Sequence, residues 1–158
     1  MHIGHILLVE ADSLDEAKAE VNHRLDGGYF GWSDWSEIGG RYIDFYVDGD
    51  SLRYSDNPEK AEQAIAKAEG FREEQLERYI DKCVENGITI TGLDVPKNTR
   101  QSFDVYPLYK AAQIASGMNC EETYVYDLTY GTQELDDFRK RVADNPENQY
   151  LIVVDFHH

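Results

Sequence analysis

The sequence predicts an α+β fold of the ferredoxin-like kind, an antiparallel sheet built from two strand–helix–strand units with both helices on one face. The main observation is that residues 1–50 and 121–158 show the same order of strand, helix and strand patterns. The second is that residues 51–120, which lie between them, have a largely helical period. A chain of 158 residues can bury one core, so we expect a single domain with a helical insertion.

The first unit begins with a strand pattern, because residues 3–10 are apolar and rich in β-branched side chains. Ser13 and Glu16 then have the spacing of a capping box, and apolar residues recur at helical spacing up to a glycine pair. Residues 41–47 alternate in character and lead into an Asp-Gly turn, which predicts the second strand.

The second unit follows the same plan. Residues 122–128 have a strand pattern, Thr132 is placed to cap a helix, and residues 150–156 predict the last strand. The apolar face of that helix comprises Leu135, Phe138 and Val142. In the ferredoxin-like fold the first and last strands would lie side by side, so that their ends could share a site.

The insertion predicts two helices. Asn57 and Pro58 form a cap and first-turn pair for a long helix that extends to Gly87, with Gly70 as a point where it could kink or split. A shorter helix is predicted over residues 107–116, and residues 88–105 indicate a loop or short strand. The expected buried stripe of the shorter helix is Leu108, Ala111, Ala112 and Ala115.

The chain is strongly acidic. It has 31 Asp and Glu residues against 15 Lys and Arg, a formal net charge of −16. Such a surface repels nucleic acid at long range and favours basic partners, so direct binding of DNA or RNA is disfavoured. Three explanations stay open: adaptation to high salt, imitation of nucleic acid, and the ordinary surface of an acidic cytosolic protein.

The sequence gives no sign of a membrane segment. No apolar run approaches the ~20 residues of a spanning helix, and the first residues lack the basic start of a secretory signal. We therefore expect a cytoplasmic protein with no membrane partner. Cys83 and Cys120 stand apart, which favours neither a zinc site nor a disulfide framework, and no cofactor is predicted.

Both tryptophans, Trp32 and Trp35, lie in the stretch GWSDWSEIGGRY, residues 31–42. Its glycine pair allows positive backbone torsions or the close approach of a ligand or another chain. Arg41 could present a two-pronged donor to a carboxylate or phosphate, with Asp34 as its internal partner. The other interpretation is that both tryptophans fill the core while Asp34 and Arg41 pair to hold the loop.

This stretch resembles the W-D-W-Y-x-I-G-G-R-W motif of small uncharacterised proteins of tailed phages and prophages. The matching residues are Asp34, Trp35, Ile38, Gly39, Gly40 and Arg41, followed by an aromatic residue, Tyr42. Asp155 and His157 loosely match a C-terminal D-x-H. The sequence departs from the motif at Ser33, Ser36 and Tyr42, where the motif has Trp, Tyr and Trp. The resemblance implies a phage or mobile-element origin and a bacterial or archaeal host cell, and it implies little chemistry.

Polar residues at the two chain ends form a second candidate site. If the outer strands are antiparallel neighbours, His2, Asp155 and His157 could converge, and imidazole with carboxylate suits a divalent metal. The alternative is a solvated chain end. An enzyme would use Asp34, Arg41, Asp155 and His157 around one pocket, with histidine as acid or base and arginine as a phosphate clamp.

A row of acidic residues recurs every four positions on the long predicted helix: Glu69, Glu73, Glu77, Asp81 and Glu85. Like charges at this spacing destabilise a helix by a few tenths of a kcal/mol, roughly, for each pair, and Glu74 with Arg78 offers one favourable pair. The row is either a solvated face or a surface that binds a basic groove. Tyrosines could add interface contacts, among them those at 42, 46, 106 and 124.

We expect a small, acidic, phage-like protein that binds a basic surface of a host protein, and that inhibits a nucleic-acid-binding or defence complex as a nucleic-acid mimic. The sequence has no nucleophile elbow, P-loop or dinucleotide-binding glycine pattern, which favours a non-enzymatic role. The alternative is a small enzyme or ligand-binding protein with a polar pocket formed by the Trp-rich loop and the terminal strands. The expected binding residues are the acidic row together with Trp32, Trp35 and Arg41.

Overall fold

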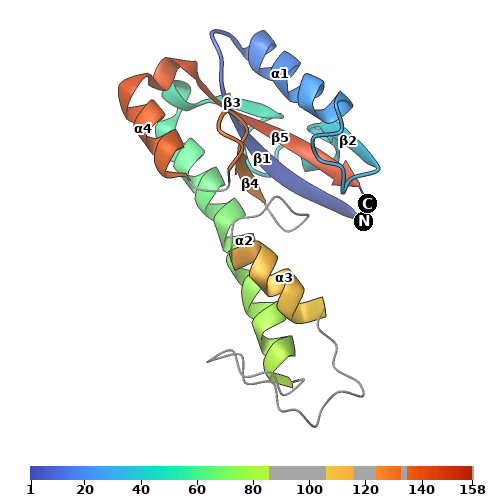
Figure 1. The fold of residues 1–158 in the computed structure, drawn as a ribbon. Coiled ribbons are helices and arrows are strands. Elements are labelled where there is room, and N and C mark those ends of the chain that lie inside the picture. Colours follow the sequence, from blue (N-terminus) through green and yellow to red (C-terminus); the bar gives the residue numbers. More distant parts are fainter. Residues whose placement is uncertain (86–105, 116–123, 133–134, 158) are drawn as a thin grey trace.

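The computed structural model describes residues 1–85, 106–115, 124–132 and 135–157, which form a mixed α/β structure of four α-helices and a five-stranded, mostly antiparallel sheet (Figure 1). The elements are β1 (His2–Glu10), α1 (Leu14–Asp26), β2 (Trp35–Ile38), β3 (Ser51–Arg53), α2 (Pro58–Glu85), α3 (Tyr106–Ala115), β4 (Val125–Asp127), α4 (Asp136–Asp144) and β5 (Gln149–His157).

The sheet is organised around the first and last strands. β1 and β5 pair antiparallel along their full length, from His2 beside His157 to Glu10 beside Gln149. β4 adds parallel to β1 on one side, while β2 and β3 both add antiparallel to β5 on the other. The expected proximity of the first and last strands is therefore confirmed, and both chain ends lie at the same edge of the molecule (Figure 1).

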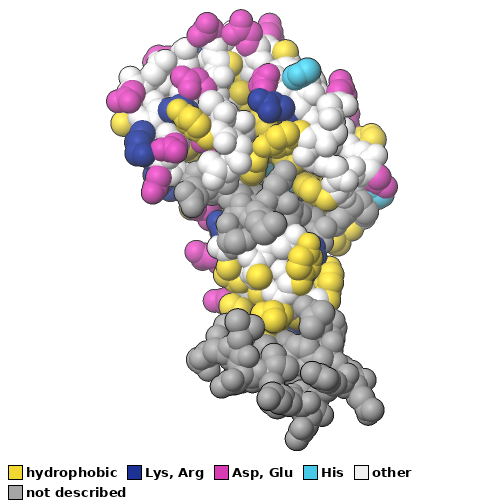
Figure 2. Space-filling model, viewed as in Figure 1, with side chains coloured by type: hydrophobic (Ala, Val, Ile, Leu, Met, Phe, Trp, Pro, Cys, Tyr) yellow, Lys and Arg dark blue, Asp and Glu magenta, His cyan; other side chains and the backbone are white. Residues whose placement is uncertain are grey.

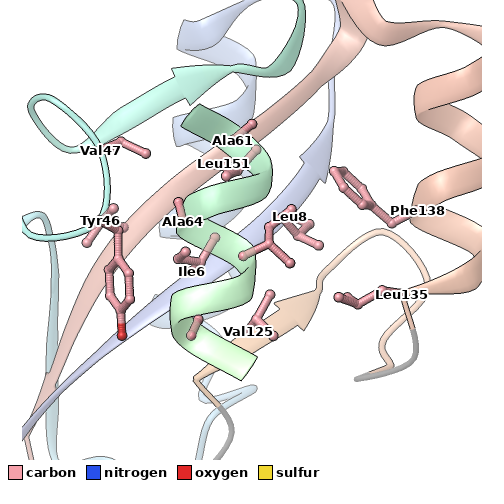
Figure 3. Packing of buried hydrophobic residues seen from close by; sticks show 13 residues of the cluster. Ile6, Leu8, Tyr46, Val47, Ala61, Ala64, Val125, Leu135, Phe138 and Leu151 are labelled. Carbon is pink, nitrogen blue, oxygen red and sulfur yellow. The ribbon is translucent and has the colours of Figure 1, made fainter. Parts of the chain in front are cut away.

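The helices cover both faces of this sheet, so the expectation that they share one face was wrong, and the ferredoxin-like arrangement is not confirmed. Even-numbered residues of β1 and odd-numbered residues of β5 pack under α2 and α4, around Ala64 and Phe138 (Figure 3). The alternate residues pack under α1, around Ala17 and Val21. The cause lies in the strands, because the central residues of β1 and β5 form continuous apolar runs, Ile6–Val9 and Tyr150–Val154, and such a run needs cover on both sides.

Residues 41–47 do not form the predicted strand. The chain makes a single 3-10 turn over Gly40–Tyr42 and continues through turns, while the short strands β2 and β3 lie on either side of it. The alternation of aromatic residues serves a different purpose. Tyr42 and Tyr46 donate their hydroxyls to the carbonyl oxygens of His2 (3.0 Å) and Gly4 (2.9 Å).

These two hydroxyls close an edge of β1 that has no neighbouring strand, because β4 pairs only with Ile6–Leu8. The Tyr42 ring lies directly against the backbone there, and a Cβ atom at Gly4 would overlap it. Glycine at position 4 is thus required for the Tyr42 ring to pack against the edge of β1.

Local signals placed most helices correctly. The Ser13 hydroxyl accepts the backbone N–H of Glu16 (3.2 Å), and the Glu16 carboxylate accepts that of Asp12 (3.1 Å), so α1 begins with a capping box. α2 begins at Pro58, where the Asn57 side chain accepts the N–H of Lys60 (3.0 Å). It then continues without a break to Glu85.

Two predictions about the other helices were wrong. α4 begins at Asp136 with Leu135 at its N-cap position, so Thr132 is not the N-cap, and the backbone of Thr132 pairs with that of Asp127. The buried stripe of α3 is Pro107, Lys110, Ala111 and Ile114, so of the predicted stripe only Ala111 is buried. The prediction for residues 88–105, the helix stop at Gly87 and Cys120 lie outside the described residues.

The second half of α2 projects away from the sheet, and α3 lies along it, so that the pair forms an arm (Figure 1). We call α3 with residues 72–85 of α2 the arm. Cys83 is fully buried in it. Among the described helices, none combines the length and the apolar character needed to cross a bilayer.

A buried ion pair joins α4 to the sheet at the end opposite the chain termini. The Arg141 guanidinium donates to both carboxylate oxygens of Asp127 (2.9 and 3.0 Å) and to the side-chain oxygen of Gln149 (3.1 Å). Asp127 and Gln149 have no exposed surface, and Arg141 is 8% exposed. Glu10 lies 3.4 Å from the same guanidinium.

Breaking this pair should be costly. Asp127→Asn or Arg141→Met should lower the free energy of unfolding by about 3–5 kcal/mol, because each leaves a buried charge without its partner. Urea denaturation measures the loss. The matched control is Lys140→Met, since Lys140 pairs with Asp137 at the exposed surface of the same helix, and we expect a change below about 1 kcal/mol. If Lys140→Met lowered the free energy of unfolding as much as Arg141→Met, the structural role of the buried pair would be contradicted.

Candidate functional site

The candidate site is formed by the adjacent ends of β1, β5 and β2. The strand register places His2 and Trp35 on either side of His157. His2, Asp155 and His157 face the same side of the sheet, which is the side that α2 covers. The convergence that the sequence predicted for the chain ends is therefore present.

Asp155 is the centre of the site and is completely buried. Nδ1 of His2 lies 2.9 and 3.1 Å from its two carboxylate oxygens, and the backbone N–H of Arg41 donates to Oδ2 (3.0 Å). Because a carboxylate only accepts, Nδ1 of His2 carries the proton in this contact. In the neutral ring Nε2 is then an acceptor, and it has no hydrogen-bond partner among the described residues.

The glycine pair of the motif makes room for this carboxylate. Gly40 has a φ of +50°, and a Cβ atom there would lie 2.6 Å from Cβ of Asp155. Gly39 has a φ of +76°, and its Cβ would lie 2.8 Å from the Ile43 side chain. The I-G-G-R segment is thus shaped around a side chain more than a hundred positions away in the sequence.

His157 forms a second histidine–aspartate pair beside the first. Its Nδ1 lies 2.8 Å from Oδ1 of Asp34, and this hydrogen bond holds the pKa of the Asp34 carboxyl below its usual range. The ring centroids of His2 and His157 are 4.8 Å apart. The rings of Trp35 and His2 meet edge to face, with their centroids 6.0 Å apart. Asp34 and His157 are accessible to solvent, unlike Asp155.

The predicted pair between Asp34 and Arg41 was wrong, because Asp34 bonds to His157. The Arg41 side chain is exposed and forms no ion pair with any residue that the structure describes; its contribution is the backbone N–H. The two tryptophans also separate. Trp32 packs against His5 and Phe156 under α1, whereas Trp35 is 46% exposed.

The arrangement offers acid–base chemistry more readily than metal binding. In the described part of the chain, no group of three or more His, Cys, Asp or Glu side chains is placed to hold a metal ion. Of the candidate ligands His2, Asp155 and His157, the first two are bonded to each other, and His157 is bonded to Asp34.

A cavity of about 480 Å³ lies next to His2, between the open edge of β1, the loop after β2 and the arm. Sequence analysis did not predict it, because its walls come from segments far apart in the chain. Four of the tyrosines that we expected at an interface, those at 42, 46, 106 and 124, line it. Neither tryptophan does, so the pocket differs from the one expected at the Trp-rich loop.

The acidic row lies on α2 as predicted. Glu73, Glu77, Asp81 and Glu85 are exposed and Glu69 is partly so, and none forms an ion pair with a described residue. The favourable pair expected between Glu74 and Arg78 is also absent from the described residues.

Comparison of the chain with protein-family models, with curated proteins and with solved structures found no match.

The role assigned to Gly40 predicts an unequal effect of two glycine substitutions. Gly40→Ala should lower the free energy of unfolding by about 1–3 kcal/mol, because the new methyl group collides with Asp155 at a positive φ. Gly70→Ala, in the middle of α2 with open space around it, should raise it by about 1 kcal/mol. Thermal or urea denaturation compares the two, and a neutral Gly40→Ala would overturn the close packing around Asp155.

The second pair can be tested by titration. The hydrogen bond to His157 lowers the pKa of Asp34 in the folded protein. The pair therefore stabilises the fold at pH values above the usual Asp pKa, and this stabilisation is lost as the pH falls through the lowered pKa of the folded state. In a His157→Gln variant the Asp34 midpoint should rise toward 3.8. Carboxyl carbon NMR shifts give both midpoints. Identical midpoints would show that His157 does not hold Asp34.

Proposed function

We propose that the protein acts by binding a basic surface of another macromolecule through the arm, without catalysis. The observation that carries this proposal is the row of exposed α2 carboxylates that form no ion pair with described residues. The biological role that fits it is inhibition of a host nucleic-acid-binding or defence complex by a phage-like protein that imitates nucleic acid.

The placement of the charges supports the proposal. Each four-residue step turns about 40° past a full helical turn, so Glu77, Asp81 and Glu85 lie on the side of α2 opposite the buried Cys83. α3 covers the other side. Figure 2 shows acidic side chains along the α2 edge of the arm and hydrophobic ones over α3. The carboxylates are therefore presented outward on an arm that, among the described residues, projects away from the sheet.

Energetics also favours a partner for this face. Neighbouring carboxylates four residues apart repel one another by a few tenths of a kcal/mol, roughly, per pair. A basic groove would remove this repulsion and release bound counterions, as happens when basic proteins bind nucleic acid. Exposed Val84, 62% accessible and next to Glu85 in the sequence, offers an apolar contact beside the charges.

Charge reversal tests the proposal. A triple variant with lysine at positions 73, 77 and 81 (Glu73→Lys, Glu77→Lys, Asp81→Lys) should lose capture of host proteins from a bacterial lysate at ~0.1 M salt, and capture by the wild type should weaken at ~0.5 M. The captured protein should also bind duplex DNA, and DNA should displace it.

The matched control changes the net charge equally at exposed sites outside the arm: Asp26→Lys, Asp56→Lys and Asp144→Lys. This variant should retain the partner. If both variants lose it equally, general charge and not the arm is responsible, and a partner that does not bind DNA would contradict the mimicry.

A further inference from the structure

The cavity beside His2 has the features of a small-molecule site, and Arg78 places it next to the acidic face of the arm. Its volume of about 480 Å³ lies within the range of about 300–1,000 Å³ that is typical of ligand pockets. Its described walls come from five places: the start of the chain through the edge of β1, the loop after β2, the middle of α2, the first residue of α3, and Tyr124 just before β4.

Aromatic rings form most of these walls. Tyr42, Phe45 and Tyr46 come from the loop, Phe71 and Tyr79 from α2, and Tyr106 from α3. The rings of Phe45 and Phe71 are nearly parallel, with centroids 6.1 Å apart, and those of Tyr79 and Tyr106 meet edge to face at 6.3 Å. Flat walls of this kind suit a planar ligand, because aromatic rings gain energy by stacking or by edge-to-face contact.

The described residues that line the cavity include a cation and no carboxylate, although Asp155 lies behind His2, and Glu74 and Asp81 lie within one helical turn of Arg78. Among the described residues that line the cavity there is no Asp or Glu, although the chain contains 31 of them. Arg78 lines it, and its guanidinium has no ion-pair partner among the described residues. The ammonium of Lys67 lies 3.6 Å from the centre of the Phe45 ring, which adds positive charge behind that wall.

Polar donors are also available at the cavity. Gln75 contributes an amide, and no described residue bonds to it. His2 presents its ring with Nδ1 held by Asp155. The backbone of Gly4 is already engaged, because its carbonyl accepts from Tyr46 and its N–H donates to the Tyr42 hydroxyl. Guanidinium and amide groups are donors that hold a carboxylate or a similar anion.

We propose that this cavity binds a planar aromatic organic anion, with the aromatic rings around its body and Arg78 pairing with its charged group. This site does not depend on the macromolecular partner proposed for the arm. It differs in its residues from the pocket expected at the Trp-rich loop.

Three matched probes test the proposal: 1-naphthoate, neutral 1-naphthalenemethanol and the cation 1-naphthylmethylammonium. Titration calorimetry and ligand-observed NMR on the full chain should show binding of 1-naphthoate, with at least about tenfold weaker binding of the other two, since a hydrogen-bonded charge pair contributes that much. Equal binding of all three, or no binding of naphthoate at millimolar concentration, would overturn the proposal.

Variants locate the site. Arg78→Gln should weaken the binding of 1-naphthoate about tenfold and leave the binding of 1-naphthalenemethanol unchanged. The control Arg139→Gln removes a cation from the exposed face of α4 and should leave the binding of both probes unchanged. Phe71→Leu should weaken both probes, with circular dichroism confirming the fold. Naphthoate that binds Arg78→Gln as tightly as the wild type would show that Arg78 does not pair with the anion.

Discussion

The burial of the Asp155 carboxylate is the constraint on which the site end of the molecule depends. Removing an ionised carboxylate from water costs several kcal/mol unless donors replace the water. Here the donors are His2 on β1 and the backbone of Arg41, and Gly40 leaves the space that they need. Three segments far apart in the sequence are therefore held in one register by a single side chain. This explains why I-G-G-R and D-x-H lie together.

The opposite end of the sheet is fastened in the same way. Between the two ends, β1 and β5 are apolar on both faces. Burial of these side chains alone would therefore stabilise several pairing registers to a similar extent. Asp155 near the end of β5 and the Arg141–Asp127–Gln149 cluster at its start distinguish the observed register. A slip of one residue in the pairing of β1 with β5 would separate Asp155 from His2 at one end and Gln149 from Arg141 at the other. The polar groups thus specify the pairing that the aliphatic core stabilises.

Sequence patterns predicted what depends on neighbouring residues. β1, β5, the capped start of α1 and the Asn57–Pro58 start of α2 all followed from local periodicity and caps. The patterns failed where the partner is distant. Residues 41–47 look like a strand because their aromatic side chains alternate, yet Tyr42 and Tyr46 are spaced to reach β1. Asp34 stands near Arg41 in the sequence, but only the register of β2 on β5 places it beside His157. The two-sided cover of the sheet had a local signal in the unbroken apolar strands, which the ferredoxin-like interpretation overlooked.

On α2 the acidic row and the cavity residue Arg78 lie close together. One side of the helix packs on α3 and the opposite side presents Asp81 and Glu85, whereas Arg78 lies only about 20° around the axis from Glu85. Glu74 and Asp81 are within one helical turn of Arg78, so their charges weaken its attraction for an anion. At physiological salt, dissolved ions screen the interaction between exposed charges that lie more than about 8 Å apart. The net charge of −16 therefore slows the approach of a small anion but does not set its affinity in the cavity. Affinity there depends on the groups within contact distance, and among the described lining residues none is acidic.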